Sequence, residues 1–330
     1  MSFVSFRDCS IAMRRWRRLI LACVGCVALG LAGGTASAQT YGLATMQPGT
    51  LAHTVASSIA KVLKEKGGLN TLVQATAGES VLIPMVVKGE IDLGIANMIE
   101  VLDAVEAGRQ SDLRMIGSIY VLRIGFFVRK DSDMKAIADL KGKRFPTGYS
   151  AMRTLDRVTL AMLATSGLTL ADLRPVPVPN VLRGGDDFLA SANDGFMFSF
   201  GGPKVREADA TVGGVRALTI PDSPAAMEAS RKVFPYGYLT DVKPGPVYVG
   251  VMEPMKVYSM DYMLFTNPKV KDEVVYKIIG TMASNKPDMV AIAPALNDFA
   301  TDSLHRQHTI PYHPGALKYF QDHKLDAKGY

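Results

Sequence analysis

Residues 69–96, LNTLVQATAGESVLIPMVVKGEIDLGIA, carry the clearest topological information in the chain, because they combine a strand, a helix and a second strand in immediate succession. Leu69 to Ala75 is typical of a strand, and Ser80 to Lys88 is typical of a helix. The turn at Gly89 then leads into a buried strand that ends at Ala96. A strand, a crossover helix and another strand predict parallel pairing, with any ligand beyond the carboxyl ends of the strands.

The same alternation extends outward from this stretch in both directions. The neighbouring elements that we expect are a strand at 41–44, a helix at 50–66, a helix at 99–107 and a strand at 114–119. A short helix at 134–140 and a second alternating series at 144–220 follow, and the chain ends in helices at about 270–284 and 315–323. Repeated alternation of this kind is typical of α/β proteins whose sheets carry helices on both faces.

Two strands are predicted to cross between these two series. Ile124 to Val128 leads out of the first series, and Tyr262 to Thr266 leads back into it. The fold class is therefore α/β with two lobes, each a mostly parallel sheet flanked by helices, joined by two hinge crossings. We expect residues 39–124 and 262–330 to form lobe 1 and residues 125–261 to form lobe 2. Two crossings create a hinge and a cleft that can close over a ligand.

The N-terminus is predicted to be a secretory signal peptide, residues 1–38. Arg14, Arg15, Arg17 and Arg18 precede an apolar run from Leu19 to Leu31, and the small-residue motif Ala36-Ser37-Ala38 marks the expected cleavage site. The run is short for a membrane anchor. A twin-arginine signal and acylation at Cys23 are weaker alternatives. The prediction places the mature protein in the periplasm, with Gln39 as its first residue.

Removal of this segment changes the chemistry available to the protein. All three cysteines, Cys9, Cys23 and Cys26, lie within it, so the mature chain would have no disulfide and no thiolate site. Five of the 37 basic residues and one of the 31 acidic residues leave with it, which reduces the net charge from +6 to +2. Such a balance gives no electrostatic support for nucleic-acid binding.

Four segments resemble known families of periplasmic binding proteins. Residues 134–144 (MKAIADLKGKR) are similar to a DLKGK segment of many two-lobed receptors. Residues 89–95 (GEIDLGI), 195–203 (GFMFSFGGP) and 310–316 (IPYHPGA) resemble motifs of the TAXI branch, whose members serve TRAP transporters. They occur in the family's order over nearly all of the mature chain. The resemblance implies a periplasmic-binding-protein fold, a small carboxylate ligand, integral-membrane TRAP permease subunits as partners, and a monomer without cofactor.

The departures from the TAXI pattern concern the ligand. Residues 44–52 (ATMQPGTLA) lack the paired tyrosines of the family, and residues 76–82 (TAGESVL) depart from its T-G-G-S pattern. Residues 148–154 (GYSAMRT) carry Arg153 where a glycine is usual. We therefore expect a ligand that differs from the glutamate of some relatives.

Candidate ligand-binding residues lie at the carboxyl ends of predicted strands and at the starts of the helices that follow. Free N–H groups at a helix start can bind an anion, and Thr50 and Ser80 are suitable caps there, although the same residue types are ordinary caps elsewhere. The candidates are Thr45, Gln47, Thr50, Ser80, Asn97, Arg123, Tyr149, Ser150, Arg153, Thr154 and Gly202.

Two arginines among the candidates could bind a ligand carboxylate. The guanidinium of Arg153 would meet the carboxylate with two parallel hydrogen bonds, or else lie in solvent. Arg123 lies beside the first crossing and would pair either with the ligand or with a structural carboxylate such as Glu100 or Asp103. Glu79 would repel a carboxylate but could accept a hydrogen bond from an ammonium or a hydroxyl group.

The sequence offers little support for catalysis. It has no nucleophile elbow, P-loop or H-E-x-x-H motif. The spacing of His305, His308 and His313 does not favour a zinc site, and we expect no metal. Three functions remain: a TRAP receptor, a receptor for an ABC importer or a sensor with the same fold, and a periplasmic enzyme built on this fold. The first is our main expectation, the second the alternative, and the third predicts turnover of the bound ligand.

Overall fold

Two long strands, which pair antiparallel with each other and with their other neighbours, organise this chain. The computed structural model describes residues 39–106, 108 and 112–329. The predicted signal peptide and its cleavage site after Ala38 lie outside these residues, and residues Thr40–Tyr330 form one compact unit. None of the helices within the described part of the chain has the length and apolar character needed to cross a membrane.

The described elements alternate along the chain as expected. The strands are β1 (Thr40–Met46), β2 (Asn70–Thr76), β3 (Leu93–Asn97), β4 (Arg114–Arg129), β5 (Arg144–Thr147), β6 (Arg174–Pro177), β7 (Gly195–Ser199), β8 (Val215–Ala217), β9 (Tyr238–Val242) and β10 (Met255–Thr266). The helices are α2 (Leu51–Glu65), α3 (Glu79–Lys88), α4 (Met98–Glu106), α5 (Leu155–Ala164), α6 (Val181–Leu189), α7 (Pro203–Val212), α8 (Pro224–Val233), α9 (Asp272–Ser284), α10 (Lys286–Ile292) and α11 (Pro314–Asp322).

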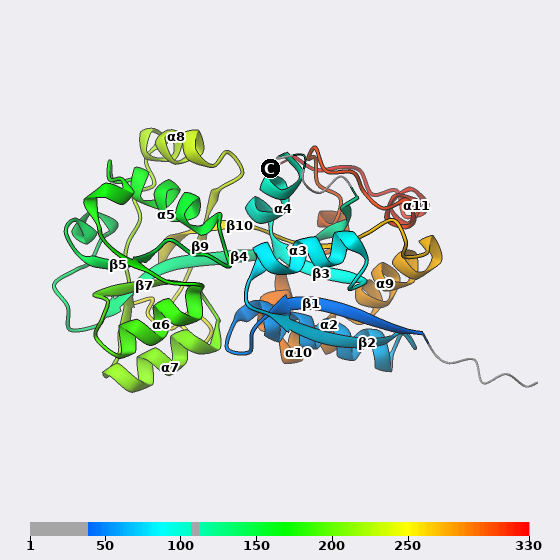
Figure 1. The fold of residues 1–330 in the computed structure, drawn as a ribbon, viewed down its shortest axis with the longest axis horizontal. Coiled ribbons are helices and arrows are strands. Elements are labelled where there is room, and N and C mark those ends of the chain that lie inside the picture. The colour runs from blue at the N-terminus through cyan, green and yellow to red at the C-terminus, as the bar shows by residue number, and fades with distance from the viewer. Residues whose placement is uncertain (1–38, 107, 109–111, 330) are drawn as a thin grey trace, which may run out of the picture. The chain divides into compact units, whose positions relative to one another are not determined.

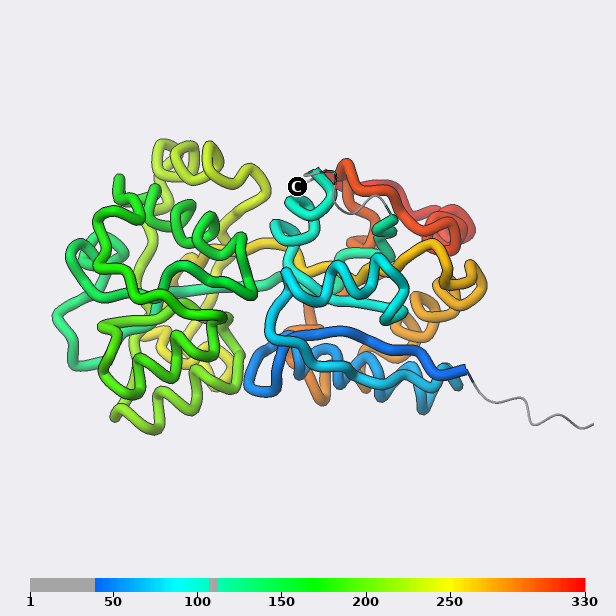
Figure 2. The backbone as a smooth tube through the Cα atoms, in the orientation of Figure 1, coloured from blue at the N-terminus to red at the C-terminus, as the bar shows by residue number. Residues whose placement is uncertain are grey.

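The fold is the two-lobed α/β fold that the sequence predicts (Figure 1). One lobe is built on β1, β2 and β3, where β1 pairs in parallel with both neighbours. The other contains β5 to β9, with β5 and β6 pairing in parallel as a separate small sheet. Strands β4 and β10 run from one lobe into the other, as the traces in Figure 2 show.

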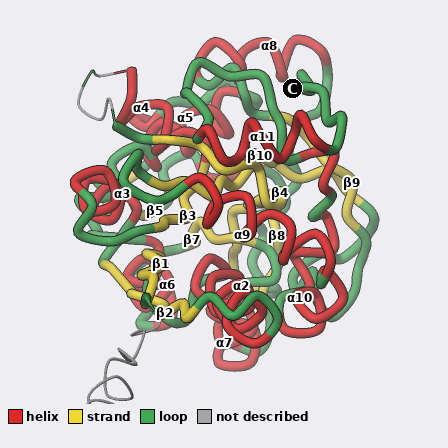
Figure 3. Tube along the Cα trace, turned by 90° about the vertical axis from the view of Figure 1, so that its right-hand side faces the viewer, coloured by secondary structure: helices red, strands yellow, loops and turns green. Residues whose placement is uncertain are grey.

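Opposite faces of the first sheet are covered by different helices. Leu43 packs in one core cluster with α2, whereas the next residue, Ala44, packs in a second cluster with α3. Successive residues of a strand point to opposite faces, so α2 and α3 must lie on the two sides of β1. Figure 3 shows helices on both sides of the strands. Each buried Leu, Ile or Val side chain in these clusters contributes about 1.5–3 kcal/mol.

The crossing strands are longer than the sequence indicates. The predicted strands at 114–119 and 124–128 are one continuous strand, β4, because the intervening residues stay extended and pair with β10. β10 is antiparallel to both β3 and β4, as expected of chains that cross in opposite directions. The order β2-β1-β3-β10-β4-β7 therefore places β4 and β10 in the middle of the sheet. The exact lobe boundaries proposed above stay a prediction.

Two local predictions are wrong. The helix expected at 134–140 is only a short 3-10 turn, Ile137–Leu140. Ser80 is not the cap of the second helix, because α3 already begins at Glu79 with Gly78 as its cap. A side chain at position 78 has no room, since a Cβ there would lie 2.1 Å from the carbonyl oxygen of Ala151. In contrast, Thr50 caps α2 as predicted, with its Oγ1 accepting a hydrogen bond from the His53 N–H at 3.2 Å.

Candidate functional site

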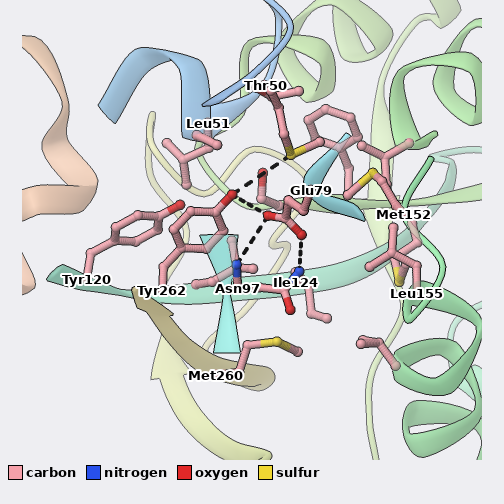
Figure 4. A pocket seen from close by; sticks show the side chains of 18 residues that line it. Thr50, Leu51, Glu79, Asn97, Tyr120, Ile124, Met152, Leu155, Met260 and Tyr262 are labelled. Carbon is pink, nitrogen blue, oxygen red and sulfur yellow. Dashed lines mark hydrogen bonds between the residues drawn. The ribbon is translucent and has the colours of Figure 1, made fainter. Parts of the chain in front are cut away.

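A pocket of about 60 Å³ lies where the two lobes meet (Figure 4). The first lobe and the crossing strands contribute Met46, Thr50, Leu51, Ala52, Glu79, Asn97, Tyr120, Leu122, Ile124, Met260 and Tyr262, and the second lobe contributes Met152, Leu155, Val158, Val181, Met197, Phe198 and Ser199. Most of these side chains are apolar. The described lining includes one carboxylate, Glu79, and no Lys, Arg or His.

Glu79 is the centre of a polar cluster at one end of this pocket. Its Oε1 accepts a hydrogen bond from the backbone N–H of Asn97 at 3.2 Å and another from the hydroxyl of Tyr262. Its Oε2 accepts from the side-chain amide of Asn97. The orientation of that amide is set by the chain, because its oxygen accepts from the Glu100 N–H at 3.1 Å. Three neutral donors from two strands, β3 and β10, thus hold a carboxyl group that is 1% exposed.

Burial changes the proton affinity of Glu79. Desolvation, followed by the negative charge of Glu100, raises the pKa of Glu79 to about 8, although the hydrogen bonds from Tyr262 and Asn97 act in the opposite direction. An isolated charge is costly in a medium of low polarity, so the neutral acid is favoured. At neutral pH the pocket therefore contains a carboxyl group that is mostly protonated and that ionises at little cost.

Tyr120 provides a second polar group at the same end of the pocket. Its ring stacks on that of Tyr262 with centroids 4.8 Å apart, since the two residues face each other in the β4–β10 register. The side chain is 2% exposed, and its hydroxyl has no hydrogen-bond partner among the described residues. Buried hydroxyl groups are usually paired, so this one can serve a bound molecule. Burial, and then the charge of Glu79, raise the pKa of Tyr120.

Of the predicted ligand-binding residues, Thr50 and Asn97 line this pocket. Thr45 is buried and Gln47 is exposed. Gly202 is the cap residue before α7, and a Cβ there would meet the ring of Phe198. Tyr149 is buried, and Ser150 is exposed. None of these five lines the pocket, and a role for any predicted residue in ligand binding stays a prediction.

Ser80, Arg153 and Thr154 instead take part in contacts between the lobes. The Arg153 N–H donates to Ser80 Oγ at 2.9 Å, and the Thr154 N–H donates to Glu100 Oε1 at 3.1 Å. Ser80 Oγ in turn donates to Glu100 Oε2 at 2.8 Å. The Arg153 side chain is exposed, in a neighbouring depression that Ser80 and Glu100 also line. Its position does not support the proposed hydrogen bonds to a ligand carboxylate.

Arg123 has a structural partner that the sequence did not indicate. Its Nη1 lies 2.5 Å from Asp298 Oδ2, and its Nε donates to Thr240 Oγ1 at 3.2 Å. The partner is therefore Asp298 rather than Glu100 or Asp103. Asp298 is 175 residues away in sequence, and only the packing of its segment beside β4 brings the pair together.

Sequence reasoning missed most of the pocket, including Tyr120 and Tyr262. A usable signal existed, because a tyrosine within an otherwise apolar buried strand needs a partner for its hydroxyl. Among the described residues, no group of three or more His, Cys, Asp or Glu side chains is placed to hold a metal ion.

Known proteins share the architecture of this chain. A family model described as the NMT1-like family matches residues 43–323. A solved structure described as a periplasmic transporter matches with a TM-score of 0.57 and 14% identity, over 88% of this chain and 94% of that one. The ligand-binding component of an ABC-type import system from Staphylococcus aureus, with zinc bound, matches with a TM-score of 0.53 and 10% identity, over 88% and 94%. Identities this low establish the fold alone.

Proposed function

We propose that this chain, which belongs to the NMT1-like family, is a solute-binding receptor that captures a small molecule between its two lobes. It binds and releases this molecule without transforming it. The receptor acts in the periplasm after removal of residues 1–38, as a monomer that delivers its ligand to the membrane subunits of an uptake system.

The pocket between the lobes is the observation that carries this proposal. Side chains from both lobes line it, and the hydrogen bonds of Ser80 and Glu100 to residues 153 and 154 join the lobes beside it. A small molecule in this position would contact both lobes at once and would stabilise their closed arrangement. Concave, mostly apolar pockets with a few convergent polar groups are the usual form of small-molecule sites.

Two kinds of membrane partner are compatible with such a receptor. The TAXI-like motifs favour TRAP permease subunits, whereas the match to a component of an ABC-type import system favours the alternative, an ABC importer. We favour the ABC importer, because the fold comparison supports it and no comparison supports the TRAP partner. The genes beside this one separate the two: an ATPase supports an ABC importer, and a large multi-span permease without an ATPase supports a TRAP system.

Filling the pocket tests the site. Native mass spectrometry of the purified protein, and thermal shift with a panel of small solutes, identify a ligand for the wild type. Ala52 is 4% exposed at the pocket wall, so Ala52→Phe places a ring in the ligand volume and is expected to lower affinity at least about tenfold. Ala225→Phe, at an exposed position of α8, is the matched control and should bind as the wild type does.

Two results would contradict this proposal. Unchanged affinity in a folded Ala52→Phe protein would place the ligand elsewhere, with circular dichroism confirming the fold. Conversion of the bound ligand into a product by the wild type would favour the enzyme alternative.

A further inference from the structure

We propose that the ligand of this pocket is a small organic amine, with an apolar body and one ammonium group that pairs with Glu79. The inference rests on the proposed function, because it names the class of solute that the receptor captures. It replaces the small carboxylate that the sequence led us to expect.

The charge of the pocket is the first argument. Glu79 receives hydrogen bonds from Asn97 and Tyr262, all of them from neutral groups. The described lining contains no cation, and the other charged side chain that acts on Glu79 is the acidic Glu100. A ligand carboxylate would face these two acids without a countercharge, which is costly in a buried site. An ammonium group supplies the missing positive charge.

The geometry around Glu79 is the second argument. In Figure 4, Tyr120 and Tyr262 lie on one side of Glu79, with the hydroxyl of Tyr120 directed toward it. That hydroxyl is buried and has no partner among the described residues, so its oxygen can accept a second hydrogen bond from the ammonium. Two stacked tyrosine rings beside a carboxylate also favour a cation.

The walls of the pocket define the rest of the ligand. Met152 and Leu155 lie opposite the tyrosines, and four methionines contribute to the lining: Met46, Met152, Met197 and Met260. Methionine side chains are flexible and adapt to apolar groups of different shape. Since the described lining offers no cation to pair with a carboxylate, the site selects amines over amino acids that have the same side chain.

Proton linkage gives this proposal a distinctive signature. The pKa of Glu79 is about 8 in the free protein, and a bound ammonium favours the ionised carboxylate, so binding below that pH releases a proton. Affinity for an amine should therefore increase about tenfold per pH unit up to about pH 8 and then level off. The other titratable groups that face Glu79 are Glu100, Tyr120 and Tyr262, and the tyrosines stay neutral throughout this range because burial raises the pKa of both.

The test uses probes that share one carbon skeleton: isopentylamine, isopentanol and isopentanoic acid. Calorimetric titration of the full mature chain between about pH 6 and pH 8 should show the amine binding at least about tenfold more tightly than the alcohol or the acid, and only the amine with rising affinity. Glu79→Gln should lower amine affinity at least about tenfold and remove its pH dependence, with alcohol affinity changing less than about threefold. Glu90→Gln, at an exposed acid, is the matched control.

Several results overturn the inference. These are equal or tighter binding of the acid or the alcohol, no binding by the amine, and unchanged amine binding by Glu79→Gln. The proposed receptor function is tested independently of the amine. It remains supported after any of these results if another solute binds the wild type and Ala52→Phe abolishes that binding.

Discussion

Glu79 shows how a single side chain can couple a binding pocket to the stability of the whole fold. The free carboxyl group is fully buried, and its pKa of about 8 exceeds the ordinary value of 4.5. The folded protein therefore keeps a proton between these two pH values that the unfolded chain has already lost. The contribution of Glu79 to the free energy of unfolding is fully present below about pH 4.5. It is lost as the pH rises to about 8, and above that pH the free energy of unfolding no longer changes because of this group.

Glu79→Gln should remove this component of the pH dependence. Between about pH 5 and pH 8, without ligand, the free energy of unfolding should fall more steeply in the wild type than in Glu79→Gln, by up to about 1.4 kcal/mol per pH unit. Urea denaturation across this range measures the difference, and Glu90→Gln should follow the wild type. Parallel curves for the wild type and Glu79→Gln would mean that Glu79 stays ionised in the folded protein.

At the scale of elements, the start of α3 meets the segment that precedes α5. Gly78 has an extended backbone, with φ of 173°, that any residue adopts without strain. Its lack of a side chain matters only because the carbonyl of Ala151 lies so close. Glycine at this position therefore permits contact between the lobes and has no role in the conformation of the chain itself.

Gly78→Ala should interfere with closure and leave folding nearly unchanged. We expect ligand affinity to fall at least about tenfold, because the added methyl group keeps the Ala151 segment away. Titration calorimetry with the ligand found for the wild type measures the loss. Gly245→Ala is the matched control, since a Cβ there meets nothing within 4 Å. Wild-type affinity in Gly78→Ala would show that this contact is not needed for binding.

At the scale of the whole molecule, two crossing strands connect two lobes that both line the pocket around Glu79. A ligand that contacts both lobes stabilises the closed arrangement by mass action. At a hundred times Kd, saturation should add about 2.7 kcal/mol to the free energy of unfolding. Solution scattering should show a smaller radius of gyration with ligand for the wild type and a weaker change for Gly78→Ala. An equal radius with and without ligand, combined with normal binding, would count against hinge closure.

Much of the architecture could be predicted from the sequence, because it depends on local patterns. Alternating strands and helices, two crossings between two lobes and the cap at Thr50 follow from side-chain periodicity and capping chemistry, which act over a few residues. The breakdown of the helix expected at 134–140 and the fusion of two strands into β4 show the limit of those patterns. Residues 120–123 stay extended because they pair with β10, and no local sequence pattern identifies β10 as the partner.

The contents of the pocket were decided only by the tertiary structure. Glu79 and Tyr262 are separated by 183 residues and meet because β10 pairs with β3 and β4 in one particular register. The same holds for Arg123, whose partner Asp298 could not be distinguished from other acids in the sequence. Periodicity indicates which face of an element is buried, but which side chains meet on that face depends on long-range packing. That packing also buries Glu79 without a cation, and so sets its charge.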